Sequence, residues 1–353
     1  MSSDIVLITD WKHLSLSKDL TIQDAIRCLN DNATQIVLVA DEFGHLLGTI
    51  SDGDIRRALL KTLSLETRVE QIMSLNPVLA NMSDSIDQAS ALMRQFRIRH
   101  IPIVDTNKRI AGVFADVLSA NADRRLNTFV IMAGGKGKRL HPHTETCPKP
   151  MLKLAGRPML EHIILQAKMQ GFIDFVLCVG HLHHVIENYF EDGARLGVKI
   201  RYIKEIEPLG TAGALSYFEP SNENPIVVSN GDIITGINYG ELLEFHCTNK
   251  SHATMSVRLN EWENPFGVVH TDGYRIQSIE EKPIVKTYVN AGIYAFSKVS
   301  LTSLNVGEKL DMPQFFSRLK KNKLNLLAYP IYETWIDVGR PEDLQRAQWE
   351  LSG

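Results

Sequence analysis

Residues able to bind phosphate gather between positions 129 and 152 of this 353-residue chain. The segment begins with apolar residues typical of a buried strand and continues with three closely spaced glycines: Gly134, Gly135 and Gly137. Glycines let backbone N–H groups approach an anion, because no Cβ stands in the way. Arg139 adds a planar guanidinium, and Lys149 adds a compact charge between two prolines that fix the backbone. The segment therefore predicts a loop that holds a triphosphate, although glycines after a strand also make plain turns.

Two common phosphate-binding patterns do not occur in this loop. It has no G-x-x-x-x-G-K-[ST] string, and its glycines lack the third member of the dinucleotide pattern. The string A-G-G-x-G-x-R-L starts at Ala133 and is followed by P-K-P-M-L; together they resemble the signature of sugar-1-phosphate nucleotidyltransferases. The resemblance implies an enzyme that transfers a nucleotidyl group from a nucleoside triphosphate to a sugar 1-phosphate. It also implies Mg²⁺ as cofactor, catalytic roles for Arg139 and Lys149, and contacts from Ala133 and the loop glycines to the nucleotide.

Strand-like and helix-like segments alternate around this loop, at residues 129–132, 157–170, 173–179, 183–190, 198–203 and 225–229. The alternation predicts a mostly parallel sheet covered by helices, with the ligand crevice at the carboxyl ends of the strands. After residue 251 the pattern changes to strands and hairpins, which we expect to form a mixed extension on the sugar side of the crevice. The predicted fold is α/β, a mixed, mostly parallel Rossmann-like sheet, preceded by an α+β region. The resemblance names it the nucleotide-diphospho-sugar transferase fold.

The first third of the chain contains an internal repeat, in which residues 20–54 match residues 84–118 at a constant offset. Each copy is predicted as helix, strand, turn, strand and helix, so that two α+β units bury one face against each other. The repeat resembles a tandem pair of CBS motifs. We expect a CBS pair at residues 1–122, with copies at about 8–60 and 72–122, and a nucleotidyltransferase domain at residues 127–353.

The resemblance to CBS pairs implies an adenine nucleotide held between the copies. Copy one retains a G-x-x-[ST]-x-x-D string with Ser51 and Asp54, whose hydroxyl and carboxylate would meet phosphate and ribose. In copy two the matching positions hold Ala115 and Leu118, so both polar groups are missing. We therefore expect at most one good nucleotide site. A purely structural or oligomerising role for the pair stays open.

Two carboxylates stand at predicted strand ends. Asp232 follows the strand at residues 225–229, and Asp337 lies in the string W-I-D-V-G-R-P. Carboxylate oxygens suit Mg²⁺, but the sequence Asn-Gly-Asp also favours a simple turn. In the resembling family these two positions hold the metal together, so the resemblance implies Asp232 and Asp337 as its ligands.

The resemblance also assigns residues to the sugar 1-phosphate. Lys282 is a catalytic residue at its phosphate, Glu281 and Asn290 contact the sugar hydroxyls, Gly231 binds the sugar, and the main chain at Gly267 lies under it. Alignment by Gly210, at the nucleotide, places Glu205 where uridylyl- and thymidylyltransferases often carry Gln. A carboxylate only accepts hydrogen bonds, which suits the N1–H and N2–H₂ groups of guanine. We therefore expect GTP as substrate. If Glu205 merely faces solvent, then UTP, dTTP and CTP remain alternatives.

The combination of a CBS pair and a short pyrophosphorylase resembles the glucosamine-1-phosphate guanylyltransferases of bacterial legionaminic-acid pathways. The string E-x-E-P-L-G-T-A-G also resembles that of mannose-1-phosphate guanylyltransferases, so glucosamine 1-phosphate and mannose 1-phosphate are the expected acceptors. An alternative from another class is a non-catalytic regulatory subunit that binds a nucleotide-sugar. Such proteins usually lose a loop cation or a metal carboxylate, whereas this chain keeps them.

Composition places the chain among ordinary soluble proteins, with 44% hydrophobic and 22% charged residues. A net charge of −3 and the lack of a long basic run argue against nucleic acid as a partner. No run approaches the ~20 apolar residues of a membrane helix, and we recognise no signal peptide. Four scattered cysteines fit free thiols in a reducing compartment. We expect a cytoplasmic homo-oligomer that binds no membrane, since CBS pairs often associate in twos.

Overall fold

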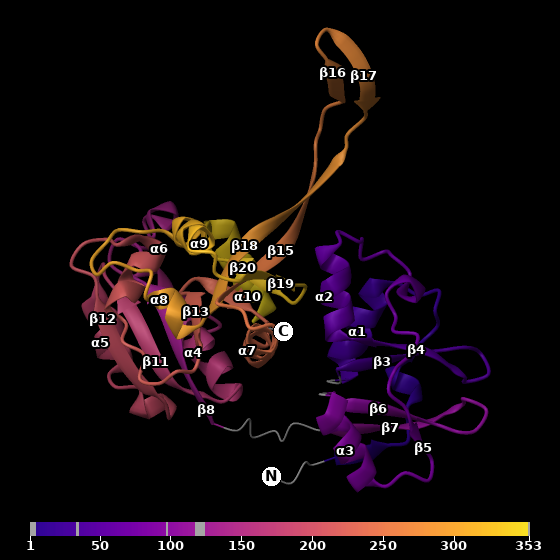
Figure 1. Cartoon of the computed structure of the whole chain (residues 1–353). Coiled ribbons are helices and arrows are strands. Elements are labelled where there is room, and N and C mark those ends of the chain that lie inside the picture. Colours follow the sequence, from indigo (N-terminus) through magenta and orange to yellow (C-terminus); the bar gives the residue numbers. More distant parts are fainter. Residues whose placement is uncertain (1–4, 33–34, 97, 117–123, 352–353) are drawn as a thin grey trace. The chain divides into compact units, whose positions relative to one another are not determined.

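The computed structural model describes residues 5–32, 35–96, 98–116 and 124–351 (Figure 1). The chain forms two compact units, Met1–Ala120 and Asn121–Gly353. Within the described residues, every helix is too short or too polar to cross a bilayer.

The first unit contains the expected repeat. Copy one comprises α1 (Ile22–Asn32), β3 (Ile36–Ala40), β4 (Leu46–Ser51) and α2 (Asp52–Leu60). Copy two comprises α3 (Ile86–Phe96), β6 (His100–Val104) and β7 (Ile110–Asp116). The strands of each copy pair antiparallel, β3 with β4 and β6 with β7. The second helix expected for copy two, with Leu118, lies outside the described residues.

Three strands of the two small sheets come from outside the repeated segments. β2 (Ser15–Leu16) pairs with β3, and β5 (Ala80–Asn81) pairs with β6, both in parallel. β1 (Ile5–Ile8) pairs antiparallel with β7, so the start of the chain completes the sheet of copy two. The repeat alone could not predict the pairing of β1 with β7, because this pairing joins segments from opposite ends of the unit.

The second unit is built on a seven-stranded sheet with the order β12-β11-β8-β13-β18-β15-β19. Its strands are β8 (Arg125–Ala133), β11 (Phe172–Val179), β12 (Lys199–Lys204), β13 (Ile226–Asn230), β15 (Ala253–Glu263), β18 (Ile284–Phe296) and β19 (Leu326–Ile331). β18 runs antiparallel to both neighbours, whereas the other adjacent pairs are parallel. The predicted mixed, mostly parallel sheet is therefore confirmed.

Helices and short hairpins complete this unit. The helices are α4 (Met159–Met169), α5 (His183–Phe190), α6 (Gly210–Gly213), α7 (Tyr239–Thr248), α8 (Lys298–Leu301), α9 (Met312–Lys321) and α10 (Pro341–Glu350). The short strands are β9 (Lys153–Leu154), β10 (Arg157–Pro158), β14 (Ile233–Thr235), β16 (Val268–Asp272), β17 (Arg275–Glu280) and β20 (Trp335–Asp337). The helix expected from residue 157 begins at Met159 instead, because Arg157 and Pro158 pair with β9.

The sheet is buried on both faces. Phe129 of β8 belongs to one apolar cluster, with residues of α4, α5 and α7, and contacts Tyr239 with ring centroids 4.8 Å apart. The next residue, Val130, belongs to a second cluster with Phe315 and Leu319 of α9. Successive strand residues point to opposite faces, so the unbroken apolar run that precedes the glycines requires both layers of helices.

β15 and β18 extend beyond the sheet. Within the described residues, β19 pairs with β15 as far as Arg258 and β13 pairs with β18 from Ile293, so their outer halves pair only with each other. Together with β16 and β17 these outer halves form a two-stranded arm, residues 259–289, that projects from the body of the unit (Figure 1). The strands and hairpins expected after residue 251 are present. The arm leads away from the body, however, and does not form the sugar side of the crevice as we had expected.

One histidine of the second unit is almost completely buried. His246 of α7 is 1% exposed. Its two ring nitrogens lie 2.9 Å from Thr254 Oγ1 and 2.8 Å from Ser297 Oγ. Burial, with a smaller effect from His252, lowers the pKa of His246 from 6.5 to about 4. The native protein therefore holds His246 neutral at pH values where the unfolded chain protonates it.

We predict that the second unit loses stability as pH falls from about 6.5 towards 4, because in that pH range His246 gains a proton in the unfolded state but not in the native state. His246 should contribute up to about 3 kcal/mol to this loss and nothing above pH 7. Urea unfolding at several pH values measures the slope. His246→Gln should flatten it, whereas His270→Gln, on the exposed arm, should leave it unchanged. Equal slopes for wild type and His246→Gln would contradict the assignment.

Candidate active site

The glycine loop leaves the carboxyl end of β8, which lies between β11 and β13. Glycines at the ends of these two neighbours allow the strands to approach it. A Cβ on Gly180, after β11, would lie 2.9 Å from the carbonyl oxygen of Gly134. A Cβ on Gly231, after β13, would lie 3.0 Å from the carbonyl oxygen of Met132, to which the Gly231 N–H donates. Three strand ends therefore meet at the loop. Ligands of open α/β sheets bind at the carboxyl ends of the strands, so a ligand crevice is expected here.

The second half of the loop is held by the segment that carries Lys149. Gly137 has φ 61°, in the left-handed region, and precedes the 3-10 turn Lys138–Leu140 that contains Arg139. A Cβ on Gly137 would lie 3.0 Å from Lys149 Cβ, and Thr144 Oγ1 donates to the Gly137 carbonyl at 2.9 Å. A larger residue at position 137 would therefore push the loop away from Lys149.

Lys149 and Asp232 form an ion pair at the strand ends. Lys149 lies in the 3-10 turn Lys149–Met151, and Asp232 lies between β13 and β14. The ammonium of Lys149 donates to Asp232 Oδ2. The lysine side chain is 9% exposed and that of Asp232 24% exposed. A fixed, nearly buried cation thus lies beside the glycine loop.

A short ladder brings the two predicted metal carboxylates together. β14 pairs antiparallel with β20, with Ile233 directly opposite Asp337. The Val338 N–H donates to the Asp232 carbonyl at 3.0 Å. The guanidinium of Arg139 lies against the same turn, since a Cβ on Gly339 would lie 3.1 Å from Arg139 Nη1. Residues from three distant parts of the sequence therefore form one charged cluster: Arg139, Lys149, Asp232 and Asp337.

The electrostatics of the cluster disfavour two neighbouring negative charges. Asp337 as a whole residue is exposed, but protein atoms crowd its carboxyl group. This desolvation, with the nearby Asp232 carboxylate, raises the pKa of Asp337, while Lys149 and Arg139 partly oppose the rise. A cation bound between the carboxylates would favour their charged forms.

The residues present fit Mg²⁺. Asp232 Oδ1 is buried and has no hydrogen-bond partner among the described residues. Residues 5–32, 35–96, 98–116 and 124–351 contain no group of three or more His, Cys, Asp or Glu side chains that could hold a metal ion. Mg²⁺ commonly uses one or two carboxylates together with water and substrate phosphates, so the Asp232–Asp337 pair suffices as protein ligands.

Glu205 reaches the glycine loop from the far side of β11. Its backbone N–H donates to the Val179 carbonyl at 2.8 Å. One carboxylate oxygen accepts the Leu209 N–H at 2.9 Å, and the other lies so close to Gly134 that any Cβ there would collide with it. Burial raises the pKa of Glu205, partly opposed by the Leu209 hydrogen bond. Gly210, with φ 81°, ends this segment. Glu205 is thus held at the loop and does not merely face solvent.

A bulge in β18 borders the cluster on the other side. Between the pairs Met255–Tyr294 and Val257–Asn290, β18 contains two residues more than β15. Asn290 Nδ2 donates to Tyr294 Oη at 2.7 Å, and its Oδ1 accepts the Gly292 N–H at 2.9 Å. Burial raises the pKa of Tyr294 to about 12, with a further contribution from Asp232. Bulges often redirect side chains beside active sites, and this one places Asn290 near the charged cluster.

Three of the predicted sugar residues lie on the arm instead. Glu281 and Lys282 follow β17, and Gly267 precedes β16. Glu281 Oε2 would lie 3.1 Å from a Cβ on Gly267, so these two residues are adjacent. From Asn290, β18 runs outward to Ile284, a length of about 20 Å at ~3.3 Å per residue. One copy of the chain therefore does not place Lys282 beside Lys149.

Comparison with known proteins agrees with this architecture. The sequence profile of the family described as nucleotidyl transferase matches residues 128–352. The chain belongs to the nucleotidyl transferase family. The CBS domain profile matches residues 1–61 and 69–119, so this nucleotidyl transferase carries two CBS domains at its N-terminal side.

Three relatives of this nucleotidyl transferase illustrate the likeness. A mannose-1-phosphate guanylyltransferase from Mycobacterium tuberculosis is 32% identical over 231 residues, 63% of this chain and 64% of the relative. The chain thus spans less than two thirds of that relative's length. A D-glycero-alpha-D-manno-heptose 1-phosphate guanylyltransferase from Aneurinibacillus thermoaerophilus is 32% identical over 63% of this chain and 97% of the relative. The crystal structure of HddC from Yersinia pseudotuberculosis complexed with GMP-PN is 26% identical, with a TM-score of 0.50, over 64% of this chain and all of that one.

The predicted CBS ligand residues of this nucleotidyl transferase bond to each other. Ser51 caps α2: its Oγ accepts the Asp54 N–H at 3.3 Å, while Asp54 Oδ2 accepts the Ser51 N–H at 2.8 Å and the Ser51 hydroxyl at 2.6 Å. Arg57 Nη2 donates to Asp54 Oδ1 at 2.6 Å. The two side chains stabilise the start of the helix, as a capping box does. An adenine nucleotide at this position stays a prediction.

Sequence reasoning missed several residues that position the site. Thr144, 1% exposed, fixes Gly137, and Tyr294 fixes Asn290. Gly339 provides the surface for the Arg139 guanidinium. None of these residues has a local spacing pattern that could have revealed its role. For Gly339, its place two residues after Asp337 in the W-I-D-V-G-R-P string was the one available signal.

Proposed function

We propose that this nucleotidyl transferase moves a guanylyl group from GTP to a sugar 1-phosphate. A phosphate oxygen of the sugar 1-phosphate attacks the α-phosphorus of GTP. The bond from that phosphorus to the bridging β-phosphate oxygen breaks, and pyrophosphate leaves. The products are a GDP-sugar and pyrophosphate. No covalent bond to the protein is needed, so the protein must position two anions and offset their repulsion.

The arrangement of charge supports this chemistry. We assign the N–H groups of Gly134, Gly135 and Gly137 to the triphosphate, and Ala133 and Gly210 to the nucleoside. Lys149 is held nearly buried beside the loop, and Arg139 is held at the Asp337 turn. Both cations face the region where two phosphate esters would meet, at a fixed position that costs little reorganisation. Mg²⁺, when held by Asp232 and Asp337, would offset further negative charge on the phosphates.

The observation that carries the choice of GTP is the carboxylate of Glu205 against the glycine loop. A carboxylate accepts hydrogen bonds, and guanine offers two donors, N1–H and N2–H₂, on one edge. The acceptor oxygens of uracil or thymine would meet the same carboxylate unfavourably. The names of the Mycobacterium and Aneurinibacillus relatives, both guanylyltransferases, support the same substrate.

We predict that Glu205→Gln lowers the preference of kcat/KM for GTP over UTP by about 5–150-fold, which corresponds to ~1–3 kcal/mol. The amide has nearly the same shape but presents a donor where guanine needs an acceptor. Pyrophosphate release with each nucleoside triphosphate measures the ratio. Glu207→Gln, an exposed neighbour, serves as the matched control and should not change it. A wild-type enzyme that prefers UTP, dTTP or CTP would overturn the assignment.

For the acceptor we propose glucosamine 1-phosphate or mannose 1-phosphate. Gly231 packs against β8, and Asn290 is oriented by Tyr294, so both can border a sugar ring beside the charged cluster. A panel of hexose and hexosamine 1-phosphates, assayed for pyrophosphate release with GTP, distinguishes the two acceptors. No release with any acceptor or nucleotide would instead favour a nucleotide-sugar-sensing subunit.

A further inference from the structure

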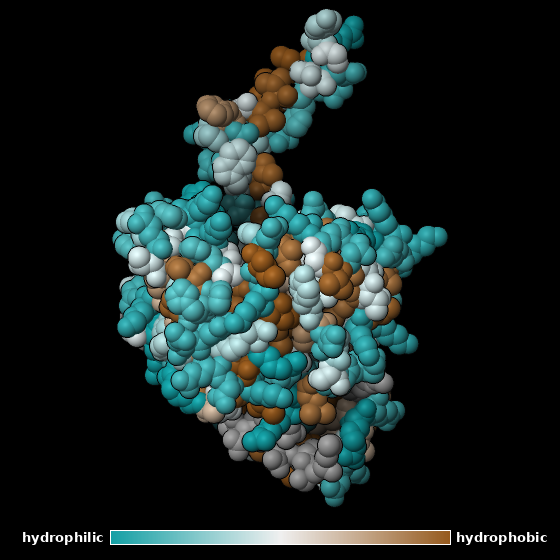
Figure 2. All heavy atoms as spheres, turned by 90° about the vertical axis from the view of Figure 1, so that its left-hand side faces the viewer, coloured by the Kyte–Doolittle hydropathy of each residue, from teal (hydrophilic) through white to brown (hydrophobic). Residues whose placement is uncertain are grey.

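The arm, residues 259–289, has apolar side chains that nothing in the described unit covers. Seven of them are at least two-fifths exposed: Trp262 54%, Phe266 74%, Val269 48%, Ile276 64%, Ile279 63%, Ile284 59% and Val285 42%. Four of them are paired across the ribbon, with Trp262 opposite Val285 and Val269 opposite Ile279. Figure 2 shows hydrophobic residues exposed along the projecting arm.

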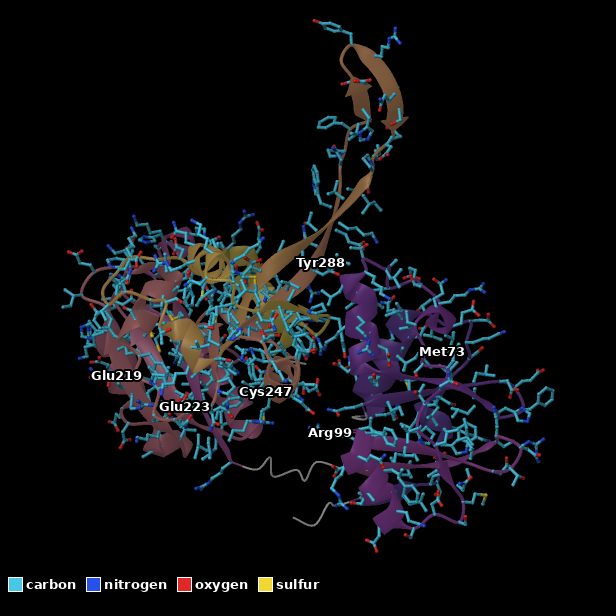
Figure 3. All side chains as sticks on the ribbon, in the orientation of Figure 1. Met73, Arg99, Glu219, Glu223, Cys247 and Tyr288 are labelled. Carbon is cyan, nitrogen blue, oxygen red and sulfur yellow. The ribbon has the colours of Figure 1, made fainter. Side chains whose placement is uncertain are left out.

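Such a ribbon is not expected to stand alone in water. An isolated two-stranded hairpin is marginally stable, and contiguous exposed apolar patches mark surfaces that bind something. The base of the arm is fixed, because the inner half of β18, from Ala291 to Phe296, is fully buried in the sheet. Tyr288, labelled in Figure 3, lies where the arm leaves the body. The arm therefore extends outward from a rigid base, away from its own charged cluster.

The arm also carries residues that the sequence predicted to bind the sugar 1-phosphate. Glu281 lies over Gly267 at the inner end of the β16–β17 hairpin, and the exposed Lys282 follows with φ 46°. The resemblance to sugar-1-phosphate nucleotidyltransferases implies that these residues serve the sugar 1-phosphate, whose phosphate repels the triphosphate of GTP in the proposed reaction. The body supplies Lys149 and Arg139 for that repulsion, and about 20 Å of strand separates its Asn290 from the outer end of β18. Each copy thus contains the charged cluster in its body and the Glu281–Lys282 segment on its arm, but it does not bring the two together.

We propose that two copies of this chain exchange arms. The arm of each copy lies over the crevice of the other and brings the partner subunit's Lys282 to Lys149, Asp232 and Asp337. A second copy is the occupant because it alone is certain to carry the complementary half, and two-fold symmetry covers both arms at once. The role given to Lys282 rests on the proposed function, whereas the exchange rests on the geometry of the arm.

A mixed dimer tests the exchange. Lys149→Ala removes a body residue, and Lys282→Ala removes an arm residue, so each homodimer should be nearly inactive. The two full-length variants are co-expressed with different affinity tags, and dimers carrying both tags are purified in sequence. If arms are exchanged, one site in each mixed dimer has both lysines and the other has neither, so activity should recover to about half that of wild type.

The possible results separate the exchange from the proposed function. Mixed dimers as inactive as their parents, or a wild-type chain that sediments as a monomer, would overturn the exchange and leave the proposed function standing. Wild-type turnover in Lys282→Ala itself would overturn the role of Lys282 in both. A second variant removes the outer arm as a whole: residues 265–282 are replaced by a two-residue turn, since the Asn264 N–H already donates to the Pro283 carbonyl at 3.0 Å. Homodimers of this variant should lose activity, and mixed dimers with Lys149→Ala should regain it.

Discussion

Lys149→Ala should reduce turnover by about 10²–10³-fold, which is the usual cost of removing one preorganised charge from a transition state. Lys149 is the most buried cation of the charged cluster, and Asp232 fixes its ammonium beside the glycine loop. Its charge is therefore available without reorganisation when the phosphates of the two substrates approach each other. Pyrophosphate release under saturating GTP and sugar 1-phosphate measures the loss.

Two further variants serve as controls for Lys149→Ala. Lys153→Ala removes an exposed lysine from the adjacent β9 and should leave turnover unchanged. Lys149→Met retains the length and packing of the side chain without its charge, so it should be as inactive as the alanine variant even if alanine destabilises the fold. Near-normal turnover in Lys149→Met, with an unchanged melting temperature, would remove Lys149 from the mechanism.

Asp337→Asn should reduce kcat/KM by about 10²-fold at fixed Mg²⁺, and it should raise the Mg²⁺ concentration needed for half-maximal activity. The carboxylate lies on the short ladder with β14, beside Asp232, whose Oδ1 has no hydrogen-bond partner among the described residues. Asparagine retains the shape of the side chain but binds Mg²⁺ less well. Because the pKa of Asp337 is raised, protons should also compete with Mg²⁺, so the wild type should need more Mg²⁺ at lower pH.

Binding of Mn²⁺, followed by electron paramagnetic resonance in the presence of GTP, provides a readout that does not depend on turnover. Asp337→Asn should weaken this binding. Glu342→Gln, an exposed substitution in the first turn of α10, is the matched control and should not. Unchanged Mn²⁺ binding in Asp337→Asn would mean that the two carboxylates do not share an ion.

The features that the sequence predicted best depend on local patterns. The apolar run of β8 and its glycines predicted both the strand and the loop, because burial on two faces and close backbone approach leave a mark within a few residues. The proximity of Asp232 and Asp337 followed only from the family resemblance. The ladder that joins them has three residues in each strand, which is too short to give a periodic signal.

Other features depend on contacts between distant segments. The hairpins of the arm were predictable, but its direction is set by where β13 and β19 stop pairing with their neighbours. The pairing of β1 with β7 joins residues 5–8 to residues 113–116, and neither segment shows a preference for the other. The Lys149–Asp232 ion pair likewise joins two motifs that we had assigned to different tasks.

The contact between Glu205 and Gly134 links two parts of nucleotide recognition that are often treated as separable. Because one carboxylate oxygen occupies the space where a side chain at position 134 would be, the residue that we propose to discriminate bases and the loop that we propose to bind phosphates share a single surface. A change of nucleotide specificity at position 205 is then restricted to side chains that fit into the same space beside the Gly134 backbone. A switch between Glu and Gln meets that restriction, whereas a bulkier or branched replacement would alter the grip on every nucleoside triphosphate at once.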